Sequence, residues 1–536
     1  MRVDLAFVNG PVFMPPGRPV GGLVVAIRGG TIVAIAPEGE EIAAERVVDL
    51  GGRLLLPGFV DAHVHPVHGG MRRLQCDMTD VDDADEAIAR IRAAAADAGE
   101  WVLGGGWLFT WFERGRPSAD LLEELTGGTP AYLVVRDGHS AWVNRSALHL
   151  AGIGADTPDP PDGRIERLPD GSPQGVLHEG AMDLVKRLTP KPSRSTVELA
   201  LREGQRVLVS HGVTAWQDAW VTEEEHRAYL ALAGRGELVA QVRGALWWDR
   251  ARGLDQMDDI VRMSSERAER YRPSTVKLML DGIVENHTAA MLDPYADHHG
   301  APSGAVGLNF IAPDLVREAV VAIERAGLQA HFHAIGDRAV RSALDAVAHA
   351  RRLRPDDGLR HHIAHIQVVH PDDLPRFAAL GVSANCQALW ACADEAMVDL
   401  TIPLLGPVRT QRQYPFGAIA AAGGHLAMGS DWPVSTPDVM AQIHVAVTRT
   451  AMDDARMPPF LPDQALSLSQ ALTGFTVGSA GVNGLEATRG TIEVGKVADL
   501  VVLDADPFGD GALAEIGVDL TVVGGRVVYE HGRLTI

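Results

Sequence analysis

The 536-residue sequence has few cysteines, few aromatic residues and no long apolar run. Its three cysteines, Cys76, Cys386 and Cys392, form no paired zinc-ribbon pattern, and so sparse a set indicates a reducing compartment without a disulfide framework. No apolar stretch reaches the roughly 18 residues that a membrane-spanning helix needs. The first residues, MRVDLAFVNGPVF, lack the apolar core and cleavage site of a secretory signal. We therefore expect a cytoplasmic protein.

Positive charge is also scarce, because 48 Lys and Arg face 70 Asp and Glu, a net charge of -22. This surplus of negative charge repels nucleic acid and anionic membranes. Hydrophobic residues make up 46% of the chain, which is enough for a sizeable core. We expect a soluble globular protein that acts on a small molecule and has no nucleic-acid or membrane partner. A homodimer is compatible with this expectation.

Both ends of the chain are rich in short apolar strands. DLAFVNG, LVVAIRGGTIVAIAP and RVVDLGGRLLLPG near the start have the same texture as GTIEVGKVADLVVLDADP and LTVVGGRVVYEHGRLTI near the end. We expect residues 1–57 and 485–536 to form one small β domain. Over residues 58–484, short apolar runs alternate with Ala-, Arg- and Glu-rich helical stretches, which predicts a parallel sheet or an eight-fold α/β barrel.

A pair of histidines, His63 and His65, closes the run GFVDAHVH. Residues two apart on a strand project from the same face, so the two imidazoles can converge on one metal ion. The preceding apolar run places them at the C-terminal end of a strand, where parallel barrels carry their chemistry. The alternative is two structural histidines, in the core or at the surface, whose hydrogen bonds are satisfied without a metal. The motif alone does not decide between these two roles.

Three further polar residues follow apolar runs: His333 in LQAHFHA, His365 in HHIAHI and Asp431 in HLAMGSDWP. Each alone is more often structural, but a barrel uses about 30 residues per strand–helix unit. His333 and His365 are 32 residues apart, and His365 and Asp431 are 66 apart, so one and two units separate them. The 212 residues between His65 and Lys277 exceed the expected spacing, which predicts an insertion at about 68–195 after the first strand.

The motifs DAHVH, HAIGD, AHIQ and GSDWP, in this order, resemble those of the metal-dependent amidohydrolase superfamily. The branch that they resemble is amidohydrolase family 3, which includes YtcJ-like proteins and N-substituted formamide deformylases. DGHSAWVNRSAL (137–148), HGVTAWQDA (211–219), KLMLDG (277–282) and GTIEVGKVADLVVLD (490–504) agree with it. The resemblance implies an α/β fold, a distorted (β/α)8 TIM barrel with a small β-sandwich domain formed by both chain termini. It also implies one or two divalent ions at the C-terminal mouth of the barrel.

Carried over by motif, the resemblance implies that the metal ligands are His63, His65, His333, His365 and Asp431. His331 shares a face with His333, and we interpret it as a packing or supporting residue. Lys277 is placed to be a carboxylated lysine that bridges two ions. The alternative is a barrel lysine paired with Asp281 or Asp431, and Asp281 and Glu285 are rival oxygen donors.

Neutral histidines with one carboxylate suit zinc, although ligand type alone leaves iron, manganese and cobalt open. We expect Asp431 to act as the general base in the cleavage of a carbon–nitrogen bond, other than a peptide bond, by metal-activated water. The alternatives are a cyclic-amide hydrolase or deaminase on the same scaffold, and a catalytically silent regulatory relative. The silent relative is disfavoured because every expected ligand position is filled.

Substrate contacts are expected from the insertion. His139 and Asn144 lie within it, with local turn chemistry as the alternative. Trp107, Phe109 and Trp111 alternate in WLFTWF, so they share one face if the segment is extended. This face is either core packing or an apolar wall that favours hydrophobic or aromatic substrates.

Overall fold

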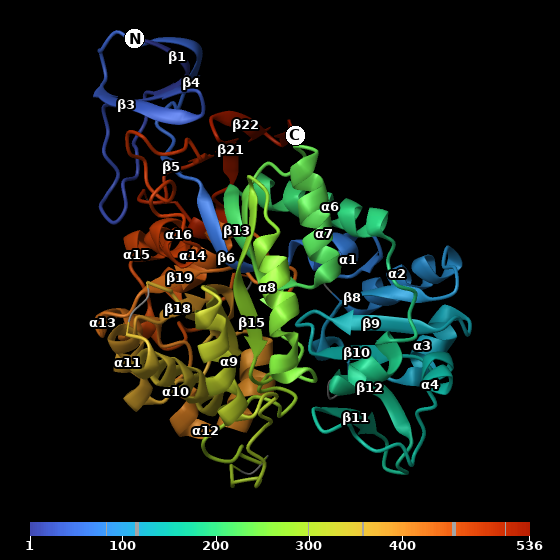
Figure 1. Ribbon diagram of the computed structural model, residues 1–536. Coiled ribbons are helices and arrows are strands. Elements are labelled where there is room, and N and C mark those ends of the chain that lie inside the picture. Colours follow the sequence, from blue (N-terminus) through green and yellow to red (C-terminus); the bar gives the residue numbers. More distant parts are fainter. Residues whose placement is uncertain are drawn as a thin grey trace.

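The computed structural model describes residues 1–81, 83–112, 117–297, 300–355, 358–452, 457–509 and 511–535. Its central element is an eight-stranded parallel sheet in the order β19-β18-β17-β16-β15-β14-β13-β6 (Figure 1). These strands are β6 (Phe59–Val64), β13 (Val213–Val221), β14 (Gln241–Trp247), β15 (Tyr271–Met279), β16 (Gln329–Ala334), β17 (His362–His365), β18 (Ser383–Cys386) and β19 (Leu426–Met428). The predicted barrel is therefore confirmed.

The barrel closes between its first and last strands through backbone hydrogen bonds just beyond β19. The amide of Asp431 donates to the carbonyl of His63 at 2.7 Å, and the amide of His65 donates to the carbonyl of Trp432 at 2.9 Å. Closure therefore joins the two segments that carry the predicted metal ligands.

Helices cover the outside of the barrel. They include α6 (Arg194–Ser210), α7 (Glu223–Gly234), α8 (Met257–Ser265), α9 (Pro313–Arg325), α10 (Asp337–Leu353), α11 (Leu374–Leu380), α13 (Phe416–Ala421), α14 (Val439–Thr448), α15 (Leu468–Thr473) and α16 (Ser479–Val482). In the connection between β18 and β19, α12 (Ile402–Thr410) packs instead on the segment that follows β15. Among the described residues, none of the helices combines the length and the apolar character needed to cross a bilayer.

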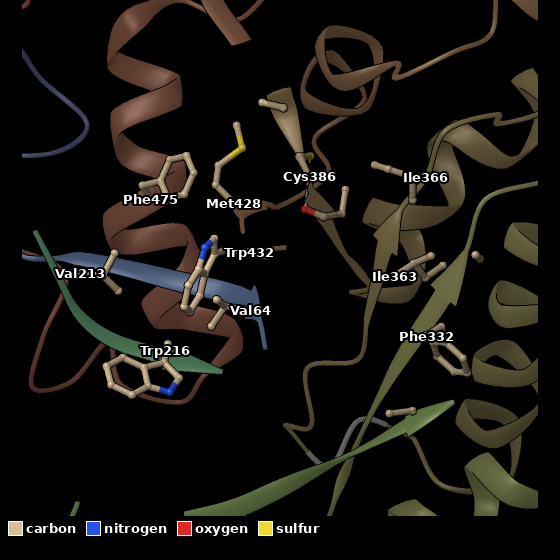
Figure 2. Close-up of a cluster of buried hydrophobic side chains, with 14 of the residues drawn as sticks. Val64, Val213, Trp216, Phe332, Ile363, Ile366, Cys386, Met428, Trp432 and Phe475 are labelled. Carbon is tan, nitrogen blue, oxygen red and sulfur yellow. Dashed lines mark hydrogen bonds between the residues drawn. The ribbon is translucent and has the colours of Figure 1, made fainter. Parts of the chain in front are cut away.

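Apolar residues next to the site histidines anchor their strands against these helices. Val64 lies between His63 and His65, and Phe332 lies between His331 and His333. Both apolar side chains are buried in the main core, as Figure 2 shows. Because successive side chains on a strand point to opposite faces, burying Val64 and Phe332 outward aims the neighbouring histidines into the barrel.

Both chain ends build two small sheets at one end of the molecule (Figure 1). One has the order β3-β2-β1-β4, from β1 (Arg2–Val8), β2 (Leu23–Arg28), β3 (Thr31–Pro37) and β4 (Ala43–Asp49). The other has the order β23-β22-β21-β20-β5, from β5 (Leu55–Pro57), β20 (Leu500–Leu503), β21 (Val518–Val523), β22 (Arg526–Glu530) and β23 (Arg533–Leu534). Phe7 and Ile27 of one sheet share a core with Leu500 and Val522 of the other, so the predicted sandwich of both termini is confirmed.

A third sheet lies between β6 and β13 in sequence and beside the barrel in space (Figure 1). Its order is β11-β12-β10-β9-β8-β7. The segment contains α1 (Pro66–Arg73), β7 (Cys76–Asp77), α2 (Ala84–Ala96), β8 (Val102–Trp107), α3 (Ala119–Thr126), β9 (Ala131–Val135), β10 (Ser140–Val143), α4 (Arg145–Ala151), β11 (Gly163–Arg167), β12 (Pro173–Glu179) and α5 (Asp183–Lys186). We call this six-stranded sheet, together with the helices of the same segment, the insertion sheet.

Candidate active site

Three predicted ligands meet where β6 ends and the chain leaves β19. Nε2 of His63 lies 3.2 Å, and Nε2 of His65 lies 2.9 Å, from Oδ1 of Asp431. One ligand atom from each residue lies within 4.8 Å of the others, so these three residues could hold a metal ion. Asp431 has φ 55°, a left-handed conformation that is costly for a residue with a side chain. The hydrogen bond of its amide to His63 holds it there.

The charge states of His63 and Asp431 are those that metal binding requires. Burial, with the nearby Lys277, lowers the pKa of His63 to about 3, so its imidazole is neutral. Burial by itself would raise the pKa of Asp431, but His63 and His65 outweigh it and hold that pKa well below its ordinary value. Neutral imidazoles and an ionised carboxylate are the ligand forms of both residue types.

His333 and His365 complete the group at the ends of β16 and β17. The ring of His365 lies 4.8 Å from that of His63 and 4.5 Å from that of His333, and Nδ1 of His365 lies 4.0 Å from Oδ2 of Asp431. The Nδ1 atoms of His65 and His365 are buried without a hydrogen-bond partner among the described residues. Unpaired buried nitrogens in a set of imidazoles and one carboxylate fit a divalent ion such as zinc.

Lys277 lies on β15, paired in register with His331 on one side and Trp247 on the other. The side chain is 2% exposed, and burial lowers its pKa to about 7. Across the described parts of the chain, its ammonium group makes no ion pair or hydrogen bond. Lys277 therefore makes no direct ion pair with Asp281 or Asp431 among the described residues, although the charge of Asp431 acts on its pKa.

The rival oxygen donors near Lys277 are engaged elsewhere. The carboxylate of Asp281 accepts hydrogen bonds from the amides of Ala290, Ile335 and Gly336, and Oδ1 lies 3.3 Å from Nδ1 of His333. Glu285 accepts a hydrogen bond from the hydroxyl of Thr401. Asp281 therefore holds the turn after β16 and faces His333.

The insertion sheet brings a charged pair to the same group. Nδ1 of His139 lies 2.8 Å from Oε1 of Glu179, and the ring of His139 lies 5.4 Å from that of His333. Burial alone would lower the pKa of His139, but the carboxylate of Glu179 outweighs it and raises this pKa to about 9. Asn286 and Thr288 also donate hydrogen bonds to Glu179. The pair therefore presents a fixed imidazolium beside His333.

A stacked pair of indoles lies beside His65. The rings of Trp220 on β13 and Trp247 on β14 are 3.7 Å apart and nearly parallel, and Trp220 lies 6.4 Å from the ring of His65. Both indoles are partly exposed. Because they stand at the carboxyl ends of their strands, they form an apolar wall beside the cluster.

Comparison with known families agrees with this geometry. A family model described as amidohydrolase family matches residues 46–529, nearly the whole chain. The chain belongs to the amidohydrolase family. This amidohydrolase is 28% identical to the putative amidohydrolase YtcJ of Bacillus subtilis (strain 168), with 92% of this chain and 91% of the relative covered. It is 27% identical to the N-substituted formamide deformylase of Arthrobacter pascens, with 98% of each chain covered.

A solved structure has the same fold. The uncharacterized metal-dependent hydrolase from Pyrococcus horikoshii OT3 superposes on the amidohydrolase with a TM-score of 0.74 at 23% identity, covering 95% of this chain and 99% of the other. The resemblance inferred from the motifs is thus confirmed, and the chain is a hydrolytic enzyme of a metal-dependent family.

Asn144, which we expected to contact substrate, has a structural role in the amidohydrolase. It is fully buried as the N-cap of α4, and its carbonyl oxygen accepts hydrogen bonds from the amides of Ala131 and Ala147. Its amide group donates to Thr126 and Thr129. Every hydrogen-bonding group of the side chain is therefore used within the insertion sheet, and the predicted substrate contact is wrong.

For Trp107, Phe109 and Trp111 the structure shows core packing, the first of the two alternatives, and not an aromatic wall. Trp107 is fully buried and its indole donates a hydrogen bond to the carbonyl of Leu133. The segment is not extended, because β8 ends at Trp107 and Phe109–Trp111 forms a 3-10 turn. Phe109 and Trp111 pack against the core around Trp107.

Two residues of the site escaped prediction from the sequence. Glu179 ends β12 with φ 51° and was not singled out by the motifs used above. The tryptophan at 220 lies just after HGVTAWQDA, at the end of an apolar strand, and this position was the available signal.

Proposed function

We propose that this amidohydrolase cleaves the carbon–nitrogen bond of a small, acyclic, hydrophobic or aromatic N-substituted amide. The observation that carries the proposal is the convergence of His63, His65, His365 and Asp431 at the mouth of the barrel. Such a set of nitrogen and oxygen donors is typical of hydrolytic metal sites.

The metal that we propose is zinc, held by His63, His65 and Asp431, with His333 and His365 as ligands of the same centre or of a second ion. Lys277 is the proposed bridge between two ions, as a carbamate formed on its side chain. Its burial, its lack of an ion-pair partner among the described residues and its lowered pKa support this role, since the neutral amine is the form that reacts with carbon dioxide. A divalent ion supplies Lewis acidity, which acidifies water and polarises a carbonyl group.

Two side chains would handle protons and charge. The ionised carboxylate of Asp431 would take the proton of the attacking water and pass it to the departing amine, which is otherwise a poor leaving group. His139, held as an imidazolium by Glu179, would donate a hydrogen bond to the oxygen on which negative charge develops. The distance between the rings of His139 and His333 supports this role.

The class of substrate follows from the walls of the mouth. Trp220 and Trp247 present stacked indoles beside His65, and Trp390 stacks on His365 at 5.5 Å. Flat apolar surfaces on both sides favour a substrate whose uncleaved part is hydrophobic or aromatic.

A metal analysis followed by a substrate panel tests the proposal. The purified protein should contain zinc, lose turnover when a chelator removes it, and regain turnover when zinc alone is restored. The panel should contain N-formyl and N-acyl amides with aromatic and aliphatic amine parts, cyclic amides and aminopyrimidines. Preferential turnover of cyclic amides or release of ammonia from aminopyrimidines would replace the proposed reaction, and a metal-replete protein inactive on every class would refute hydrolysis.

A further inference from the structure

A chain of hydrogen bonds leads from His63 into the barrel interior, away from the mouth. Nδ1 of His63 lies 2.9 Å from Nε2 of His331, and Nδ1 of His331 lies 2.7 Å from Oε1 of Gln217. The same oxygen of Gln217 lies 3.0 Å from Nε2 of His362. All four side chains are buried. An imidazole nitrogen can donate or accept, so the function of this chain depends on where its protons lie.

The direction of the bonds to Gln217 can be deduced from one backbone carbonyl. The carbonyl oxygen of Ser479 can only accept, and it lies 2.9 Å from Nδ2 of Asn483, which identifies that end of the side chain as the amino group. Oδ1 of Asn483 must then accept the bond, 3.0 Å long, from Nε2 of Gln217. The backbone carbonyl of Asn483 accepts from Nε of Arg243 at 2.8 Å, which holds this residue in place.

The oxygen of Gln217 therefore faces the histidines, and it can only accept. His331 must carry its proton on Nδ1, and His362 must carry one on Nε2, to donate to this oxygen. His331 is fully buried and pairs with no carboxylate in the described part of the chain, so a second proton on its ring would be an uncompensated buried charge, and Nε2 keeps its lone pair. His63 then donates to that lone pair from Nδ1, and its own Nε2 carries a lone pair directed at Asp431.

We propose that Gln217 is a positioning residue that fixes the tautomer of His63 through His331, so that Nε2 of His63 is available to the metal. The proposal rests on the proposed function in that it takes His63 as a metal ligand. Ligating histidines are commonly oriented by a carboxylate or a backbone carbonyl. In this amidohydrolase the orienting group is the neutral side-chain amide of Gln217, two hydrogen bonds away from His63. The tautomer of His63 is therefore fixed without adding a negative charge near the metal.

Zinc affinity measures this role directly. We expect Gln217→Met to weaken the binding of zinc alone by about 10- to 100-fold, in a competition assay with a chromogenic chelator. Methionine is unbranched and similar in length, so it keeps the volume but replaces the amide oxygen with a thioether, a far weaker acceptor for the bond from His331. The matched control is Gln205→Met in α6, a buried glutamine that donates to the carbonyl of Glu237 and accepts from the amide of Val239. The control should bind zinc within about threefold of the wild type.

A double variant separates positioning from general loss of structure. If Gln217 acts only through His331, then Gln217→Met combined with His331→Leu should bind zinc no more weakly than His331→Leu alone. Additive losses, or equal losses in Gln217→Met and Gln205→Met, would overturn the proposal.

The tautomer can also be observed without any variant, so the proposal stays testable if a variant does not fold. Neutron diffraction from the deuterated wild-type protein should place a deuteron on Nδ1 of both His63 and His331. A deuteron on Nε2 of either residue would overturn the relay. If the wild type binds no zinc, the proposed function fails; if it binds zinc and hydrolyses amides but Gln217→Met is unaffected, the relay alone fails.

Discussion

Replacing Gly429 with alanine would test whether the closure of the barrel positions the metal ligands. Gly429 follows β19 and faces β6. A Cβ built on it would lie 2.6 Å from the backbone nitrogen of His63 and 2.7 Å from its Cβ. Ordinary contacts begin at 3.4 Å, so the two segments would have to separate by about 0.8 Å. The φ angle of Gly429 is not in the left-handed region, so the perturbation is steric.

This separation acts directly on two proposed metal ligands, because His63 lies on one segment and Asp431 follows Gly429 on the other. Overpacking of this kind costs about 1–3 kcal/mol of stability. A displacement near 1 Å at a reacting centre can lower turnover about 100-fold. We therefore expect Gly429→Ala to remain folded, with a lowered melting temperature, weaker zinc binding and about 100-fold slower amide hydrolysis.

The assays are thermal unfolding, zinc competition and turnover of the best amide from the panel. Gly234→Ala is the matched control, since a Cβ at this last residue of α7 meets nothing within 4 Å. We expect the control to be as active as the wild type and slightly more stable, by up to about 1 kcal/mol. Wild-type zinc affinity and turnover in Gly429→Ala would refute the idea that the contact between β6 and β19 sets the ligand geometry.

Three further predictions concern the mouth of the barrel. Asp431→Asn should retain zinc through the histidines but lose about 100- to 10,000-fold in kcat, measured beside metal content; an unchanged kcat would remove Asp431 from proton transfer. Glu179→Gln removes the counter-charge of His139 and should lower kcat about 100- to 1,000-fold with little change in KM, whereas an effect on KM alone would assign the pair to binding. Trp220→Ala should raise KM about 3- to 10-fold for amides with an aromatic amine part and leave small aliphatic amides unaffected; equal effects on both would contradict stacking.

The sequence predicted those parts of the molecule that are encoded locally. His63, His333 and Asp431 each follow an apolar strand within a short motif, and their spacing in units of strand plus helix predicted one barrel. The alternation of apolar and polar residues then aims the predicted ligands on these strands inward, as Val64 and Phe332 show. Such features depend on a few neighbouring residues, so they can be predicted without knowledge of the tertiary contacts.

The parts that were missed depend on contacts between distant segments. Glu179 becomes part of the site only because β12 pairs with β10 and places its carboxylate against His139, 40 residues away. Asn144 shows the opposite error, because a polar residue in a suggestive motif was taken for a substrate contact. The signal against this was local: an asparagine directly before the helical run RSALHLA is typical of an N-cap.

The attachment of β6 to the terminal domain makes the proposed metal ligands His63 and His65 sensitive to a remote part of the chain. β5 is separated from β6 by Gly58 alone, and β5 is held by β20, with the amide of Gly58 donating to the carbonyl of Asp499 at 2.8 Å. The C-terminal strands thus help to hold β6 in place, although they contribute no group to the site. Proteolytic removal of the segment after Asp499 should therefore inactivate the enzyme, and a fusion partner at that end should be joined through a linker that leaves β20 to β23 undisturbed.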